Sequence, residues 1–205
     1  MTSQSDDEHD LAIHEAGHAV AYLRLGKRIA KVTVIPDRKQ GSAGHVERAR
    51  RGAPPTEESK ARIEQLCKGE RRDAWASHAE EEIIVSMAGL AAQRLLARGP
   101  LRKWRARFDE GDILELALSL DLGPEEALAL LGVLRRDADE LVAQSRDTIE
   151  LIAEALLEHG TLTHDDVVVV YEHGLAGLAL VRDWMRRRAW RERVESTPAE
   201  LRIDW

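Results

Sequence analysis

The chain of 205 residues is poor in cysteine and in aromatic residues. Cys67 is its only cysteine, so no disulfide can form within the chain and cysteine-rich zinc modules are excluded. Aromatic residues make up 4% of the chain, and a hydrophobic content of 43% must therefore build the core mostly from Leu, Ala, Val and Ile. The formal net charge of −7 argues against a general nucleic-acid binder, whose surface is usually basic.

Membrane, export and nucleotide-binding signals are absent as well. The N-terminus has no basic segment followed by an apolar one, as a signal peptide would. The most apolar stretch, residues 167–181, is interrupted by Glu172 and His173, and no run of about 18 apolar residues exists. No GxxxxGK[ST] phosphate loop occurs, so we expect no ATP binding. These absences predict a soluble cytoplasmic protein of one domain, with or without a tail.

The most informative segment that is present is an HExxH box, His-Glu-Ala-Gly-His at residues 14–18. A capping pattern at residues 5–8 and a stop at Gly26 predict a helix around it. Two histidines four residues apart lie on one helix face, where both rings can reach one Zn²⁺ ion. Glu15 between them can take a proton from a zinc-activated water. We therefore expect His14 and His18 as zinc ligands and Glu15 as the catalytic base; the alternative is two histidines without a metal.

The pattern of the remaining chain predicts a mostly α, α+β fold. After the HExxH helix, residues 31–36 and 42–47 alternate as strands and form a small hairpin. Helices are predicted from Ser77 and from Asp109, over residues 124–158 with one or two breaks, and from Thr163 towards residue 190. Residues 48–58 are predicted to be a mobile loop.

A catalytic zinc site usually needs a third protein ligand and one position open for water. A third histidine in the longer metzincin pattern is excluded, because Ala21 and Arg24 occupy the required positions. The remaining candidates are a glutamate on the helix from Ser77 (Glu80, Glu81 or Glu82) and Asp112, near the start of a later helix. The local chemistry does not decide between Glu81 and Asp112.

Several segments, in order, resemble the proteolytic domain of FtsH-type ATP-dependent zinc metalloproteases. They are HEAGHAVAYL, KVTVIP with a glycine-containing second strand, MAGLAAQ at residues 87–93 and GDILELA at residues 111–117, within a similarity spanning about residues 9–170. The resemblance implies that Asp112 is the third ligand of one zinc ion, although Asp109 close by could compete. The acidic residues of the family after Ala-Ala are replaced by Gln93 and Arg94, which puts a supporting role for them in doubt. The family's ATPase module and membrane helices have no counterpart here.

The resemblance divides the chain into a metallopeptidase domain, residues 1–172, and an Arg- and Trp-rich helical extension, residues 173–205. We expect an ATP-independent zinc metalloendopeptidase that cleaves peptides or unfolded segments, with a separate partner delivering folded substrates. A substrate strand would add to the edge at residues 42–47, where Gly44 permits close approach and His45 assists. The alternative is a zinc-stabilised binding or adaptor protein without turnover. Nucleic-acid and membrane partners are not expected, and the oligomeric state stays open.

Overall fold

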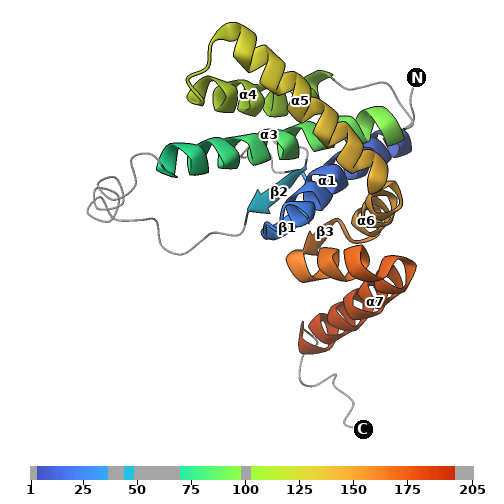
Figure 1. Ribbon diagram of the computed structural model, residues 1–205. Helices are drawn as coiled ribbons and strands as arrows, with labels where there is room; N and C mark the ends of the chain where they lie inside the picture. Colours follow the sequence, from blue (N-terminus) through green and yellow to red (C-terminus); the bar gives the residue numbers. More distant parts are fainter. Residues whose placement is uncertain (1–3, 37–43, 49–69, 98–102, 197–205) are drawn as a thin grey trace.

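The computed structural model describes residues 4–36, 44–48, 70–97 and 103–196. Mostly helical elements surround one small sheet, which confirms the predicted α+β class (Figure 1). In chain order they are α1 (Gln4–Arg24), β1 (Ile29–Thr33), β2 (His45–Arg48), α3 (Glu70–Leu96), α4 (Lys103–Ser119), α5 (Pro124–Gln144), α6 (Arg146–His159), β3 (Thr161–Thr163) and α7 (His164–Ser196). Helix α1 lies at the centre and contacts both α3 and α6.

The sheet is antiparallel with strand order β2-β1-β3. Thr33 of β1 lies opposite His45 of β2 on one side and opposite Thr161 of β3 on the other. The hairpin of β1 and β2 was expected from the sequence, whereas β3 was not. Strand β3 has three residues and depends on its pairing with β1, although its alternating Thr-Leu-Thr pattern suits an extended strand.

Small residues allow α1 to pack closely on α3. The fully buried positions of α1 are mostly alanines, with larger side chains at Ile13 and Val20. At Gly17, an added Cβ atom would lie 2.6 Å from the Cβ of Ala92 and 2.8 Å from the carbonyl oxygen of Ala88. A side chain at Gly17 would therefore push the two helices apart.

The helix boundaries agree with the sequence at some positions and differ at two. The helical region predicted over residues 124–158 is broken once, at Ser145, in line with the one or two breaks expected at unspecified positions, and α6 ends before Gly160 as predicted. The start at Ser77 was wrong, since α3 begins at Glu70 and no Gly or Pro interrupts residues 70–77. The start at Asp109 was also wrong, because α4 begins at Lys103 and the Asp109 carboxylate contacts a histidine instead of capping a helix.

Helix α7 bends at Gly174, where φ is 55°. The predicted division of the chain after residue 172 falls beside this bend, and that division stays a prediction. The predicted loop at residues 48–58 lies outside the described residues apart from Arg48, which ends β2. Within the described part, no helix is long and apolar enough to cross a membrane.

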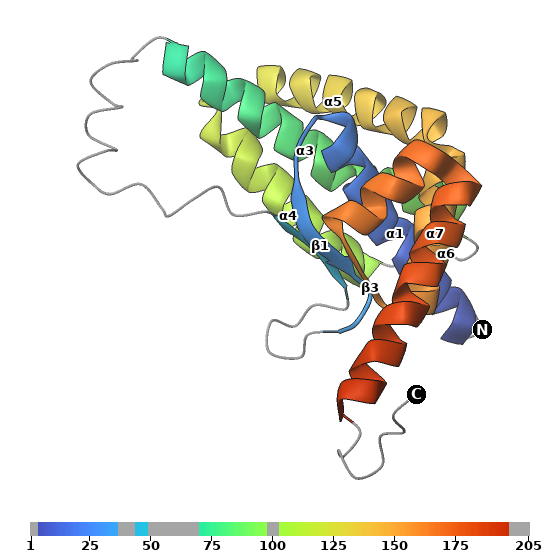
Figure 2. The same ribbon diagram turned by 90° about the horizontal axis from the view of Figure 1, so that it is seen from below.

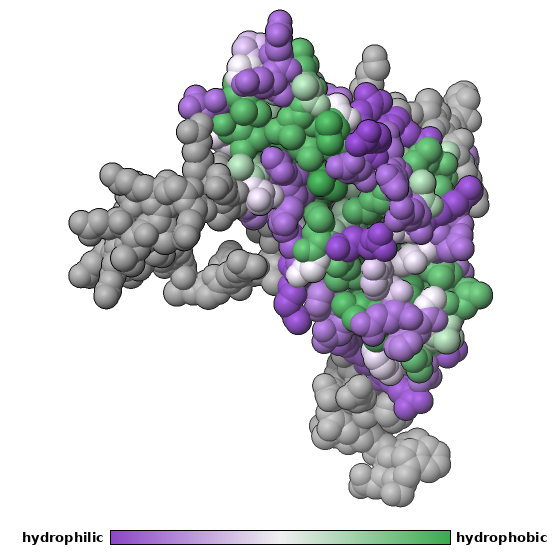
Figure 3. Space-filling view, viewed as in Figure 1, coloured by the Kyte–Doolittle hydropathy of each residue, from purple (hydrophilic) through white to green (hydrophobic). Residues whose placement is uncertain are grey.

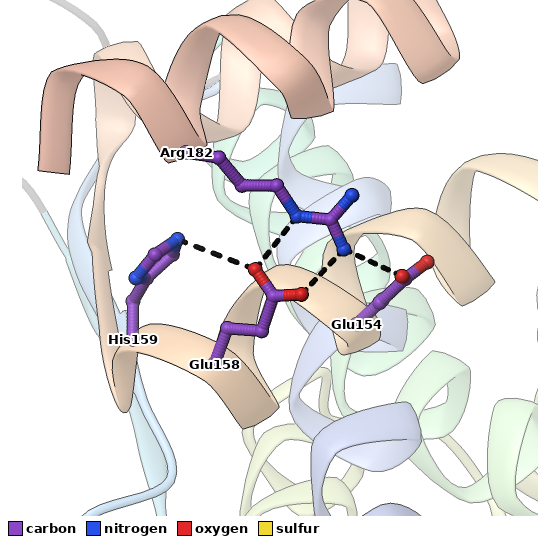
Figure 4. Close-up of polar contacts among 4 residues, drawn as sticks. All are labelled: Glu154, Glu158, His159 and Arg182. Atoms are coloured by element: carbon purple, nitrogen blue, oxygen red, sulfur yellow. Dashed lines mark hydrogen bonds and ion pairs between the residues drawn. The ribbon is translucent and has the colours of Figure 1, made fainter. Parts of the chain in front are cut away.

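One arginine joins the second half of α7 to α6 (Figure 4). Arg182 donates hydrogen bonds to Glu154 at 2.6 Å and to both carboxylate oxygens of Glu158, one of them at 2.7 Å. His159 Nε2 lies 3.7 Å from the same Glu158 carboxylate. The hydrogen bonds from Arg182 lower the pKa of Glu158, and those to Glu158 and Glu154 raise the pKa of Arg182. The second half of α7 is thus held to α6 by charge as well as by packing.

We predict that Arg182→Gln destabilises the protein at pH 7 but not in acid. The group is solvent-exposed, so screening limits the loss in the free energy of unfolding to about 1 kcal/mol or less. Because the folded pKa of Glu158 is lowered, its stabilisation is present above the ordinary pKa and is lost as pH falls through the folded value. Urea unfolding at pH 7 and about pH 3 measures this. Equal destabilisation at both values would contradict the ion-pair role.

Candidate metal centre

Three side chains from two helices converge at the centre of the molecule. His14 and His18 come from successive turns of α1, and Asp109 comes from α4. The Nε2 atoms of the two histidines are 3.1 Å apart. Asp109 places one carboxylate oxygen 3.1 Å from His14 Nε2 and the other 3.5 Å from His18 Nε2. Both histidines are buried, and Asp109 is partly buried.

The backbone of α3 fixes the orientation of the His18 ring. His18 Nδ1 lies 2.8 Å from the carbonyl oxygen of Val85, which can only accept, so Nδ1 carries the proton. This leaves the lone pair of His18 Nε2 directed at the cluster, the arrangement usual for a metal-binding histidine. Gly89, one turn after Val85, leaves the space for the ring, since a Cβ atom there would lie 2.3 Å from His18 Nε2.

The three side chains fit a zinc ion. Tetrahedral ligands about 2.0–2.1 Å from zinc lie about 3.3 Å from each other. Here the two Nε2 atoms are 3.1 Å apart, and they lie 3.1 and 3.5 Å from the two different oxygens of the Asp109 carboxylate. The donor set of two imidazoles and one carboxylate also suits zinc. The buried Asp109 Oδ2 has no well-aligned hydrogen bond within the described structure. A divalent cation would satisfy the three converging electron-rich groups together.

The charge balance at Asp109 favours the ionised form. Burial would raise the pKa of Asp109, but electrostatic attraction to the imidazole rings of His18 and His14 and the contact with His14 outweigh it, and the pKa is lowered. Asp109 is therefore available as a carboxylate, the form that binds a metal.

Glu15 lies on the same helix as the two histidines and is buried. The turn at Gly44, just before β2, lies directly against it, because a Cβ atom at Gly44 would be 2.9 Å from Glu15 Oε1. The same Cβ atom would be 2.9 Å from the carbonyl oxygen of Thr33. Glycine thus lets the start of the edge strand approach the Glu15 carboxylate.

The structure brings Asp109 to the histidines, whereas the family resemblance implied Asp112. Asp109 shares the inward face of α4 with Ile113 and Ala117, which are buried next to α3. Asp112 lies off that face and is exposed. The two aspartates are three residues apart, a rise of about 4.5 Å along the helix. The geometry therefore favours Asp109 as the third ligand. Which aspartate binds the metal stays a prediction.

The other residues considered from the sequence lie elsewhere. Glu81 is half-exposed and its carboxylate lies 2.9 Å from Lys27 Nζ. His45 opens β2 opposite Thr33 and is not part of the described cluster. Arg94 pairs with Asp139 of α5 at 2.5 Å. Gln93 is 2% exposed, and its amide has no hydrogen-bond partner within the described residues.

Two features of this site could not be read from motif spacing. In the sequence, Gly89 stands within the MAGLAAQ segment, and nothing in that segment indicates that it faces a histidine ring. Asp109 was recognised as a competitor, but its inward orientation depends on how α4 packs. The i, i+4 spacing of Asp109, Ile113 and Ala117 is the signal that favours it.

Known proteins similar to this chain are zinc metalloproteases. The ATP-dependent zinc metalloprotease FtsH of Streptococcus pneumoniae, in each of two strains, is 26% identical over 83% of this chain and 29% of its own length. The ATP-dependent zinc metalloprotease FtsH 2 of Phytoplasma mali is 24% identical over 80% of this chain and 25% of its own length. No family model matches. The chain is thus a distant homologue of FtsH zinc metalloproteases, spanning less than a third of their length.

We predict that Gly89→Ala weakens zinc binding about 10- to 100-fold, because the new methyl group displaces the His18 ring. Competition with a chromophoric chelator measures the affinity. Gly132→Ala in α5 is the matched control, since nothing lies within 4 Å of a Cβ atom there. Unchanged affinity in Gly89→Ala would mean that His18 does not bind the metal in this orientation.

Paired variants distinguish which aspartate of α4, Asp109 or Asp112, is the third zinc ligand. Asp109→Asn should lower zinc affinity by at least about 10-fold, because it removes a charged ligand, whereas Asp112→Asn and Glu81→Gln should leave it within about twofold. Asparagine keeps the side-chain volume, so the comparison isolates the charge. Loss of affinity in Asp112→Asn with none in Asp109→Asn would assign the ligand to Asp112 instead.

Proposed function

We propose that this protein is a zinc metalloendopeptidase that cleaves peptides or unfolded segments without ATP. The observation that carries the proposal is the convergence of His14, His18 and Asp109 around one point, with the Glu15 carboxylate on the same helix as the histidines. The distant homology to zinc metalloproteases supports the same class of reaction.

His14, His18 and Asp109 would hold the zinc ion. When bound, zinc supplies a Lewis acid that polarises a carbonyl group and makes water more acidic. The protein contributes rigid positioning, because α3 fixes His18 through Val85 and Gly89, and α4 presents Asp109. Two of the three ligands come from one helix, so only the position of α4 has to be set by long-range packing.

Glu15 would act as the general base and then as the general acid. Its carboxylate would accept a proton from the water that attacks the peptide carbonyl, and would donate it to the leaving amine. Burial of Glu15 beside the Gly44 turn keeps the carboxylate in a fixed place.

The substrate would bind as an extended strand along β2. In the order β2-β1-β3, strand β2 pairs with β1 and is an outer strand of the described sheet. Gly44, just before β2, is next to Glu15, so a peptide added at this edge would pass the Glu15 carboxylate. Gly44 and His45 would then contact the substrate. An edge of this kind recognises extended backbone, which peptides and unfolded segments offer and folded proteins do not, so a delivering partner would be needed for folded substrates.

A second candidate is a zinc-stabilised binding or adaptor protein that does not turn over substrate. It is favoured by Gln93, whose buried amide lacks a hydrogen-bond partner among the described residues, and by Arg94, which pairs with α5. The presence of Glu15 next to the proposed ligands favours the enzyme, because a structural zinc site needs no general base.

We predict that Glu15→Gln abolishes cleavage, with a loss of at least about 100-fold in kcat, while zinc binding stays within about twofold. The substitution keeps the shape of the side chain and removes its basicity. Cleavage of casein or of a quenched fluorescent peptide library measures the first effect, and metal analysis of the purified protein measures the second. Wild-type cleavage in Glu15→Gln would refute the catalytic assignment.

The proposed independence from ATP is tested by measuring cleavage with and without added ATP. Cleavage of the peptide library by the wild-type chain should proceed at the same rate with and without ATP. No cleavage of any peptide by a zinc-loaded wild type would instead favour the adaptor. ATP-stimulated degradation of a folded substrate by this chain alone would contradict ATP independence.

A further inference from the structure

Two buried polar groups near the metal centre have no hydrogen-bond partner in the part of the chain that the structure describes. Gln93 of α3 is buried, and neither its amide nitrogen nor its amide oxygen is paired there. The Nδ1 atom of the buried His14 is unpaired as well, whereas Nδ1 of His18 meets the Val85 carbonyl. Buried polar groups are nearly always paired in proteins, so each of these two requires an explanation.

Helices α1 and α3 run antiparallel, which sets the order of their contacts. Tyr22 of α1 donates a hydrogen bond to Glu82 of α3 at 3.2 Å. Earlier in α1, a Cβ atom at Gly17 would lie 2.6 Å from the Cβ of Ala92. A lower residue number in α1 thus corresponds to a higher one in α3. The two helices pack against each other, as the views in Figures 1 and 2 show.

This order brings Gln93 to the level of His14. The His18 ring lies against Gly89, since a Cβ atom there would be 2.3 Å from His18 Nε2. One helical turn towards the start of α1 leads from His18 to His14, and one turn towards the end of α3 leads from Gly89 to Gln93. The unpaired amide therefore lies beside the turn of α1 that carries the unpaired Nδ1.

The residue after Gln93 has a different environment. Helix α5 forms part of the face seen in Figure 3, where polar and apolar side chains are mixed. Arg94 pairs with Asp139 of this helix, at 2.5 Å. Gln93 is instead 2% exposed, so solvent does not pair with its amide. Helix α3 therefore presents one of these two polar residues to α5 and the other to the interior.

The chemistry of a bound metal supplies a reason for a buried acceptor beside His14. Metal binding through Nε2 requires the proton of the neutral ring to lie on Nδ1. Metal-binding histidines almost always donate this N–H group to a carboxylate, a carbonyl oxygen or water. The amide oxygen of Gln93 can accept such a hydrogen bond, and the flexible side chain can turn the amide towards the ring.

We propose that Gln93 is the positioning residue of His14, its amide oxygen accepting a hydrogen bond from His14 Nδ1 when Nε2 binds zinc. Helix α3 then orients both histidines, His18 through the main chain of Val85 and His14 through the Gln93 side chain. The role rests on the proposed zinc site, and it is the same whether the protein cleaves peptides or only binds them.

Two variants of Gln93 test this role by chelator competition and by thermal unfolding. Gln93→Met keeps the side-chain length but removes the acceptor, and should bind zinc about 10- to 100-fold more weakly. Its metal-free form should be at least as stable as the wild type, because the amide it replaces has no partner within the described residues. Gln93→Glu restores an acceptor oxygen and should bind zinc at least as tightly as the wild type, since a carboxylate makes the ring more basic. Lower stability in Gln93→Met without a change in zinc affinity would show a purely structural role and overturn the proposal.

A second measurement does not depend on any variant being folded. The ¹H–¹⁵N NMR spectrum of the zinc-loaded wild type should contain two slowly exchanging imidazole Nδ1–H signals, one from His18 and one from His14. Gln93→Met should lose the His14 signal and keep that of His18. A wild-type spectrum with only the His18 signal would overturn the proposal.

Arg94→Met is the matched control, because Arg94 is the next residue of α3 but pairs with α5; its zinc affinity should stay within about twofold of the wild type. Equal zinc affinity in Gln93→Met and the wild type would overturn the proposal and leave the zinc site standing. Asp10 is buried one turn before His14. Weaker zinc binding in Asp10→Asn with none in Gln93→Met would assign the Nδ1 partner to Asp10 instead. A wild type that binds no zinc would overturn the site and this role together.

Discussion

The close crossing of α1 and α3 is the contact on which the rest of the structure depends. Gly17 and Gly89 remove the side chains that would otherwise hold the two helices apart. The approach brings the Val85 carbonyl within hydrogen-bonding distance of His18 Nδ1 and so fixes the ring that faces Asp109. A glycine inside a helix costs about 1 kcal/mol relative to alanine. Two glycines are nevertheless found at this crossing, because a side chain at Gly17 would clash with α3 and one at Gly89 would clash with the His18 ring.

A buried ionic group anchors the other end of the same crossing. Glu82 of α3 is 3% exposed and accepts a hydrogen bond from Tyr22 of α1 at 3.2 Å. It also accepts one from Lys27, which follows α1, at 2.8 Å. A carboxylate buried without such partners would be strongly destabilising. The pairing thus fixes where the chain leaves α1 and enters β1, and through β1 it places β2 and Gly44 against Glu15.

The features that depend on residues close together in the sequence could be predicted, whereas those that depend on packing between distant segments could not. The HExxH residues lie on one helix, and their convergence follows from helical periodicity alone. The α+β class, the β1–β2 hairpin and the end of α6 before Gly160 follow from local patterns. Asp109 and Gly89 could not be placed in this way, because their roles depend on how α4 and α3 pack against α1. Strand β3 was missed for the same reason, since three residues become a strand only through pairing with β1.

Two imidazoles of α1 and a carboxylate of α4 are proposed to bind one zinc ion. X-ray absorption spectroscopy at the zinc edge of the zinc-loaded protein tests it most directly. We expect nitrogen and oxygen ligands at about 2.0 Å from zinc, with outer-shell scattering from two imidazole rings and no sulfur. A shell that contains sulfur from Cys67, or one without imidazole scattering, would contradict it.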